Sequence, residues 1–204
     1  MSDLYAAVFQ QQQGQAFQAR HGLTSAQYQQ TFDELVPQGY RPTIVSGYLA
    51  DGQDRFAAVF EQRQGPAFQA RHDLTSTQYQ QTFDELVPQG YRPTVLCGYP
   101  ADGRVRFAAV FEQRQGPPFQ ARHDLTSAQY QQTFNELVPQ GYRPTIVSGY
   151  LADGQDRFAA VFEQRQGPAF QARHDLTSTQ YQQTFDELVR QGYRPTVLCG
   201  YSSA

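Results

Sequence analysis

A repeated Arg-His-Asp triplet is the feature of this sequence with the most chemical potential. It occurs as Arg71-His72-Asp73 and returns every 51 residues, except that Gly22 replaces the aspartate in the first copy. Such groups could serve acid–base catalysis, metal binding or hydrogen bonding to a polar ligand. The candidate ligand-binding residues are Arg20, His21, Arg71, His72, Asp73, Arg122, His123, Asp124, Arg173, His174 and Asp175.

Catalysis and metal binding are the weaker interpretations of the triplet. Ser76 could complete a Ser/His/Asp set with His72 and Asp73, but it follows Thr75 at a helix start, where serine is common for backbone reasons. No Gly-x-Ser-x-Gly motif accompanies it. Each copy offers only one histidine beside one aspartate, and metal ligands must converge. We therefore expect no catalytic residue, no metal and no cofactor, and a protein that is not an enzyme.

Two interpretations of the triplet remain open. In the first, His72 and Asp73 bond the entry of the helix while Arg71 pairs with Glu85. In the second, planar donors and acceptors beside Phe68 bind sugar hydroxyls, one shallow site per repeat. The second predicts a multivalent carbohydrate-binding, lectin-like protein whose partner is a glycan or glycoprotein. A structural or protein-targeting module is the alternative.

The triplets belong to an internal repeat that covers the whole sequence. Four blocks of 51 residues account for all 204 residues, with no insertion. Such repeats form one continuous array, so we expect a single repeat domain over residues 1–204. Its repeats are 1–51, 52–102, 103–153 and 154–204.

Each block predicts one helix and a β-hairpin. A capping box of Thr24 with Gln27 starts the helix, and Gly39 suits its end. Residues 41–48 predict a strand, followed by an Asp-Gly turn and a second strand at 55–61. Residues 62–74 are expected to form a loop, which a short extended or helical piece around residues 68–70 would shorten. The predicted fold class is α+β, with four helix/β-hairpin repeats forming a closed or half-barrel-like sheet backed by helices.

The sequence begins with the second strand of the hairpin and ends with the first. If residues 4–9 pair with residues 194–201, the array closes and hides its edges. A homodimer that covers the two ends is the alternative.

Composition narrows the classes of partner. The net charge is −3, and every basic residue is an arginine placed at fixed repeat positions. A nucleic-acid-binding domain usually carries a basic stripe, so none is expected, and no apolar run is long enough to enter a membrane. Residues 1–5 do not resemble a signal peptide, which leaves the cytoplasm and non-classical secretion both open. Cys97 and Cys199 are 102 residues apart, and we expect no disulfide between them.

The full motif resembles a known family. The run Arg-Phe-Ala-Ala-Val-Phe, then Gln-Ala-Arg-His-Asp-Leu-Thr, Phe-Asp-Glu-Leu-Val and Gly-Tyr-Arg-Pro is similar to the bacterial tandem repeat of polyglycine-hydrolase-like proteins. The resemblance implies an α/β half-barrel-like domain, often beside a serine-hydrolase domain of β-lactamase type. Phe60 and Phe68 stand where that family often has tryptophan. The Ser-x-x-Lys signature of the hydrolase requires a lysine, and this sequence has none.

Overall fold

A computed structural model describes residues 15–201, which hold three complete modules and part of a fourth. A complete module runs strand, helix, short 3-10 turn, strand, strand. The first module is β1 (Phe17–Leu23), α1 (Ser25–Leu35), β2 (Tyr40–Ala50) and β3 (Gln53–Gln62). The others are β4 (Phe68–Leu74), α2 (Ser76–Leu86), β5 (Tyr91–Ala101) and β6 (Arg104–Gln113); β7 (Phe119–Thr126), α3 (Ser127–Leu137), β8 (Tyr142–Ala152) and β9 (Gln155–Gln164); and, in the fourth, α4 (Ser178–Arg190).

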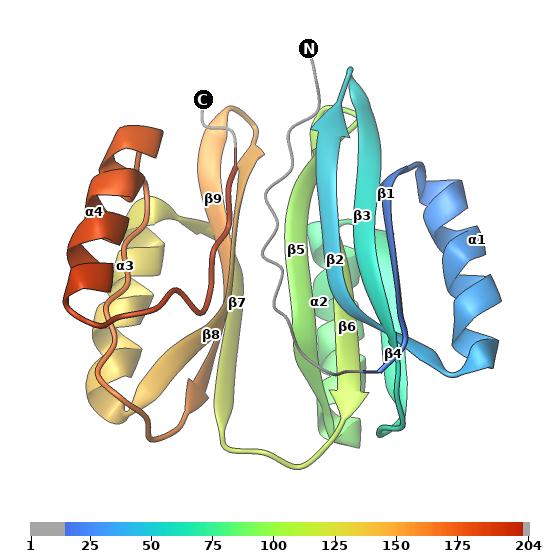
Figure 1. Cartoon of the computed structure of the whole chain (residues 1–204), viewed down its shortest axis with the longest axis horizontal. Helices are drawn as coiled ribbons and strands as arrows, with labels where there is room; N and C mark the ends of the chain where they lie inside the picture. The colour runs from blue at the N-terminus through green and yellow to red at the C-terminus, as the bar shows by residue number, and fades with distance from the viewer. Residues whose placement is uncertain (1–14, 202–204) are drawn as a thin grey trace.

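Each complete module is a three-stranded antiparallel sheet with one helix packed against it (Figure 1). The strand that comes last in sequence lies in the middle, so the orders are β1-β3-β2, β4-β6-β5 and β7-β9-β8. The expected hairpin between the strand at 41–48 and the strand at 55–61 is confirmed as β2 paired with β3.

The helix boundaries follow the capping signals. The side chain of Thr24 accepts a hydrogen bond from the backbone N–H of Gln27, and the Gln27 side chain accepts one from the N–H of Thr24. This reciprocal pair satisfies two donors that a helix start would otherwise leave open. After the helix, Gly39 has a φ of +86°, a left-handed conformation that glycine adopts without a Cβ clash.

The expected loop at 62–74 is wrong in its second half, where strand β4 takes the place of the short extended or helical piece expected around residues 68–70 and continues to Leu74. Its hydrogen bonds go to β6, the middle strand of the same module, in an antiparallel register that pairs Ala70 with Val110. A shift in register lies between Arg71 and Leu74, at the triplet itself. Four of the seven residues of this strand are polar, so its apolar alternation is weak and the sequence pattern did not show its full length.

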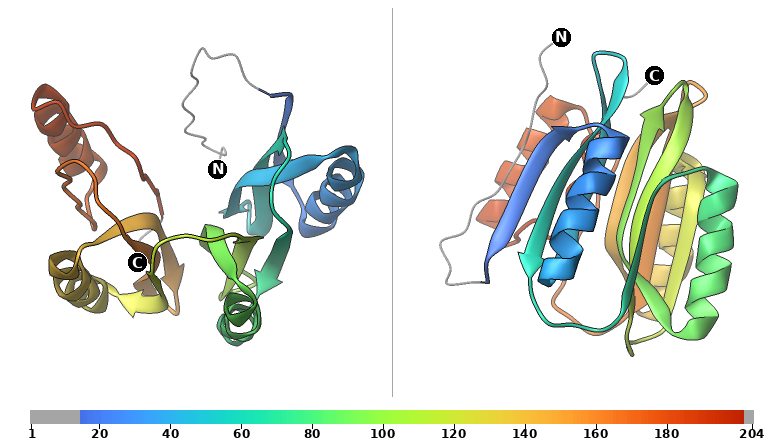
Figure 2. Two further views of the ribbon diagram at one scale, coloured as in Figure 1. Left: turned by 90° about the horizontal axis from the view of Figure 1, so that it is seen from below. Right: turned by 90° about the vertical axis from the view of Figure 1, so that its right-hand side faces the viewer.

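The modules are arranged in an open arc with their helices on the outside (Figure 2). Within residues 15–201 there are three separate sheets, and none is closed. The closed sheet that we expected is therefore not found. The pairing predicted for residues 4–9 lies outside the described residues.

Consecutive modules share one hydrophobic core. Phe56 and Ala58 of the first module form a buried cluster with Tyr99 and Val110 of the second. A Cβ placed on Gly47 would lie 2.4 Å from the ring of Tyr99, so the two modules meet at a position that only glycine can fill. We call this contact surface between consecutive modules a seam. Burial of apolar surface in the seams means that no module completes its core alone.

Candidate functional site

The histidine and aspartate of the triplet lie in the seam, bonded to a serine of the preceding module. Ser25, at the start of α1, donates a hydrogen bond to Asp73. The Nε2 atom of His72 lies 3.2 Å from the Oγ atom of Ser25. The next two seams repeat the set as Ser76 with His123 and Asp124, and Ser127 with His174 and Asp175.

Asp73 is also held by a tyrosine of its own module. Its backbone N–H donates to the Tyr99 hydroxyl at 3.0 Å, and that hydroxyl donates to the Oδ1 atom at 2.7 Å. Asp73 has a φ of +54°, in the left-handed region that aspartate enters more readily than most residues. Burial, together with the bond to Asp73, raises the pKa of Tyr99, so the hydroxyl stays protonated as a donor.

His72 is packed among aromatic rings. Its ring is edge-on to Tyr28 at 4.9 Å and to Phe56 at 5.5 Å between centroids. Burial lowers the pKa of His72, with the nearby Asp73 charge opposing the shift. A histidine with a lowered pKa is neutral at pH 7, which suits a hydrogen-bonding role in the seam.

This Ser/His/Asp set does not have the geometry of a catalytic relay. A relay uses one nitrogen of the ring for the carboxylate and the other for the serine. Here Ser25 and Asp73 both approach Nε2 of His72, at 3.2 and 3.6 Å, and the serine bonds the carboxylate directly. The Ser25 hydroxyl is therefore already bonded to the Asp73 carboxylate, and the three residues connect two consecutive modules.

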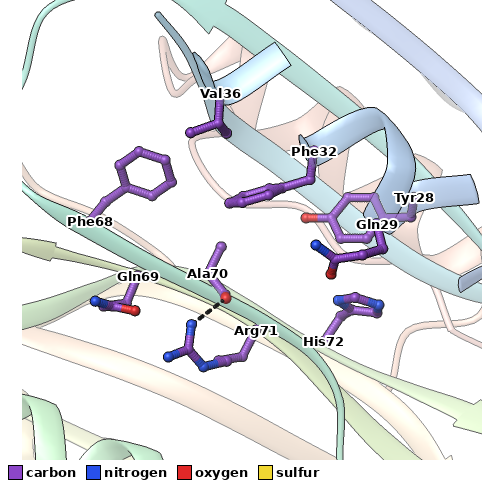
Figure 3. A pocket seen from close by; sticks show the side chains of 9 residues that line it. All are labelled: Tyr28, Gln29, Phe32, Val36, Phe68, Gln69, Ala70, Arg71 and His72. Atoms are coloured by element: carbon purple, nitrogen blue, oxygen red, sulfur yellow. Dashed lines mark hydrogen bonds between the residues drawn. The ribbon is translucent and has the colours of Figure 1, made fainter. Parts of the chain in front are cut away.

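The arginine of the triplet lies apart from the histidine. Figure 3 shows the Arg71 side chain on the opposite side of β4 from α1, whereas His72 points toward the helix. Arg71 is exposed, and its Nη1 atom donates to the carbonyl of Ala70 at 2.9 Å. The first copy is alike: Arg20 donates to the Ala19 carbonyl at 3.0 Å, and His21 is exposed. Since neighbours on a strand point to opposite faces, the triplet does not converge on one point.

A shallow groove lies between α1 of one module and β4 of the next (Figure 3). Its volume is about 450 Å³. Phe32 of the helix meets Phe68 of the strand edge-on, with ring centroids 6.1 Å apart. The equivalent ring pairs in the following seams are also 6.1 Å apart. The groove is lined by Tyr28, Gln29, Phe32, Val36, Phe68, Gln69, Ala70, Arg71 and His72.

A buried ion pair closes the other end of the seam. Arg41 of the first module lies 3.3 Å from the carboxylate of Glu112 in the second, and Arg63 lies 3.1 Å from the same oxygen. Both Arg41 and Glu112 are only 8% exposed. The guanidinium of Arg41 also lies over the ring of Phe68, 4.5 Å from its centroid. One face of Phe68 is therefore already covered, which leaves its edge for the groove.

Two sets of residues were missed by the sequence analysis. The serine at the start of each helix was considered only with the histidine of its own repeat, whereas it bonds the histidine and aspartate of the next one. The glutamine of the helix that lines the groove, Gln29, was not among the candidate ligand-binding residues. The constant step of 51 residues could have suggested contacts between repeats, but it does not say which faces meet.

The described part of the chain contains no group of three or more potential metal ligands. No helix in that part is long and apolar enough to cross a membrane. Both cysteines are free.

Comparison with known families identifies the repeat. The model of the polyglycine hydrolase-like structural repeat matches residues 14–63, 65–114, 116–165 and 167–204. The chain belongs to this family. Each complete match of the polyglycine hydrolase-like repeat spans one strand-helix-strand-strand module, so the family unit and the structural module coincide. A search of curated proteins found no match to the chain.

Proposed function

We propose that the chain is a non-catalytic repeat domain that binds carbohydrate weakly at several equivalent grooves. Its main support is the groove at the first seam, whose pair of phenylalanine rings recurs at the next two seams with the same 6.1 Å spacing. Equivalent sites at fixed spacing suit a ligand that is itself repetitive, such as a glycan-coated surface.

The groove offers groups that sugars use. The edges of Phe32 and Phe68 provide an apolar wall, and the amides of the exposed Gln29 and the half-buried Gln69 provide planar donors and acceptors beside it. Arg71 adds a guanidinium on the outer side of the strand. Sugar rings pair apolar C–H faces with hydroxyls, so this mixture of edges and amides matches their surface.

Several weak sites would act together. A single shallow site would bind near millimolar, about −4 kcal/mol. Sites linked in one rigid array would raise the apparent affinity for a glycan surface by ~10²–10⁴ if the spacing fits. The protein would then bind surfaces well and free sugars poorly.

A matched pair of triple variants tests the groove. Gln29, Gln80 and Gln131, one per groove, would be changed together to alanine. The control changes the next helix residues, Gln30, Gln81 and Gln132, which are equally exposed. On a glycan array, the first variant should lose at least tenfold in apparent affinity and the control should not. Equal binding by the two variants would place any glycan site elsewhere.

A third variant tests the triplet. Arg71, Arg122 and Arg173 would be changed together to alanine, against a control in which Arg55, Arg106 and Arg157 are changed. Both remove three charges. A selective loss in the first variant assigns the arginines to the ligand site.

A structural or protein-targeting module is the second candidate. It is favoured by the use of His72 and Asp73 in the seams and by the family's description as a structural repeat. It predicts no hit on a glycan array and capture of a protein or peptide in a parallel pull-down.

A further inference from the structure

The fourth module has no middle strand among its described residues. Residues 170–176 and 193–201 correspond to the outer strands of the complete modules, and neither is a strand here. Helix α4 has no buried residue, whereas α1, α2 and α3 each bury a tyrosine and a leucine. Since the middle strand contacts both neighbours in every complete module, its place in the fourth module is unfilled within residues 15–201.

The helix and the last segment of the fourth module expose large apolar side chains. Phe185, Val189, Val197 and Leu198 are 36, 44, 38 and 62% exposed. In the second module, the residue equivalent to Phe185 packs edge-on against a phenylalanine of the middle strand, 6.4 Å between centroids. A groove of about 540 Å³ takes its place in the fourth module, lined by Phe185, Val189, Gly192, Tyr193, Arg194 and Pro195.

The sequence contains a fourth copy of the middle strand. Residues 55–62, 106–113 and 157–164 supply the middle strands of the three complete modules. Residues 4–11 repeat their pattern, with Tyr-Ala-Ala-Val-Phe in place of Phe-Ala-Ala-Val-Phe. The alternation of large and small apolar residues is therefore retained. These residues lie outside the described range, and their sequence is that of the strand which the fourth module lacks within residues 15–201.

We propose that residues 4–11 form the middle strand of the fourth module in the same molecule. Five residues, 12–16, join this segment to β1, and five residues, 63–67, join the equivalent strand segment at 55–62 to β4. A join of equal length places the segment in the module that precedes the first one. The fourth module then precedes the first, and a tethered strand has a much higher effective concentration than one from another molecule.

The two ends of the arc carry complementary seam faces. In the first module Phe17 and Ile44 are 65 and 57% exposed, whereas their equivalents in the second module are half-buried against the first. In the fourth module a Cβ on Gly200 would meet nothing within 4 Å, although the equivalent Gly47 faces a tyrosine ring. The ends flank the opening of the arc (Figure 2). Closing that opening would form the same seam again and bury both faces.

The register of the complete modules predicts which residues meet. Ala57 lies opposite Ser46, and Ala108 lies opposite Cys97. By the same register, Ala6 should lie opposite Cys199. Residues directly opposite on antiparallel strands have Cα atoms about 4.5–5.5 Å apart, within the range that a disulfide spans.

A single cysteine therefore tests the proposal. Ala6→Cys would be made in a Cys97→Ser background, since serine already stands at this position in two repeats. Under mild oxidation of the 204-residue chain, we expect an intramolecular disulfide to Cys199, seen as a faster monomer on a non-reducing gel and confirmed by peptide mass. The control is Ala7→Cys in the same background, whose side chain would point to the other face and should leave both thiols free.

Each other outcome overturns the proposal. Disulfide-linked dimers would show that the segment enters a second molecule. Equal cross-linking by Ala6→Cys and Ala7→Cys would show contact without the predicted register. Free thiols in both variants would leave the fourth module without this strand.

Discussion

Replacing Gly149 with alanine should destabilise the seam between the third and fourth modules. A Cβ at this position would lie 2.3 Å from the Cδ1 atom of Tyr201, where ordinary contacts are 3.4–4 Å. The ring or the backbone must therefore move by about 1 Å. Such overpacking typically costs about 1–3 kcal/mol. We expect the lower half of that range, because Tyr201 is only half-buried and has room to shift.

The same change in an interior seam should cost more. Gly98 faces Tyr150 at 2.4 Å, and that ring is 1% exposed with its hydroxyl bonded to Asp124 at 3.0 Å. Since this ring can neither move aside nor leave its partner, Gly98→Ala should cost about 3 kcal/mol.

A double-mutant cycle isolates the cause. The free energy of unfolding would be measured in urea for Gly149→Ala, Tyr201→Ala and the double variant. If the Cβ clashes with the ring, Gly149→Ala should cost almost nothing once the ring has been removed. An equal cost in both backgrounds would refute the steric argument and point to the backbone of the glycine.

Three further changes test the polar parts of the seams. Glu112→Gln should lower the free energy of unfolding by about 2 kcal/mol, with little dependence on salt, because its ion pair is buried; strong screening by salt in urea titrations would argue for an exposed pair. Ser25→Ala should lower the free energy of unfolding by about 1–2 kcal/mol, because its hydrogen bond to Asp73 is lost. Ser178→Ala should be neutral, because a seam between the fourth module and the first would place Gly22, not an aspartate, opposite Ser178. Equal melting temperatures of the two variants would contradict this. Burial lowers the pKa of His72 and of His123 below the ordinary value. The unfolded chain therefore binds protons first, and stability should fall as the pH drops below about 6.5; replacing both histidines with asparagine should flatten that part of the profile.

Local signals in the sequence predicted the helices and hairpins well. The Thr24 capping box and the left-handed Gly39 are short-range devices, and both are present as predicted. The hairpin of β2 and β3 likewise follows from one Asp-Gly turn between two alternating runs. In each case the interacting groups are close in sequence, so a short stretch of the chain contains the information.

Contacts between repeats could not be predicted from such local signals. His72 and Asp73 were grouped with Arg71 because the three are adjacent in sequence. Strand alternation places the Arg71 side chain on the other face, and the side chains of His72 and Asp73 bond a serine across the seam. The bond from Ser25 joins residues 48 apart, which no local pattern marks. Only a short extended or helical piece was expected where strand β4 lies, because this strand is defined by its pairing with β6 rather than by its own apolar content.

The separations of the seam contacts have a consequence for how the chain folds. The hydrogen bonds that recur from one seam to the next join residues 47, 48, 50 or 71 positions apart. Folding rates fall as contacting residues become more distant relative to chain length. An added repeat lengthens the chain while leaving these separations unchanged, so relative contact order decreases as the array grows. In longer arrays of this unit, folding should therefore propagate module by module, with each new seam forming about as fast as the first.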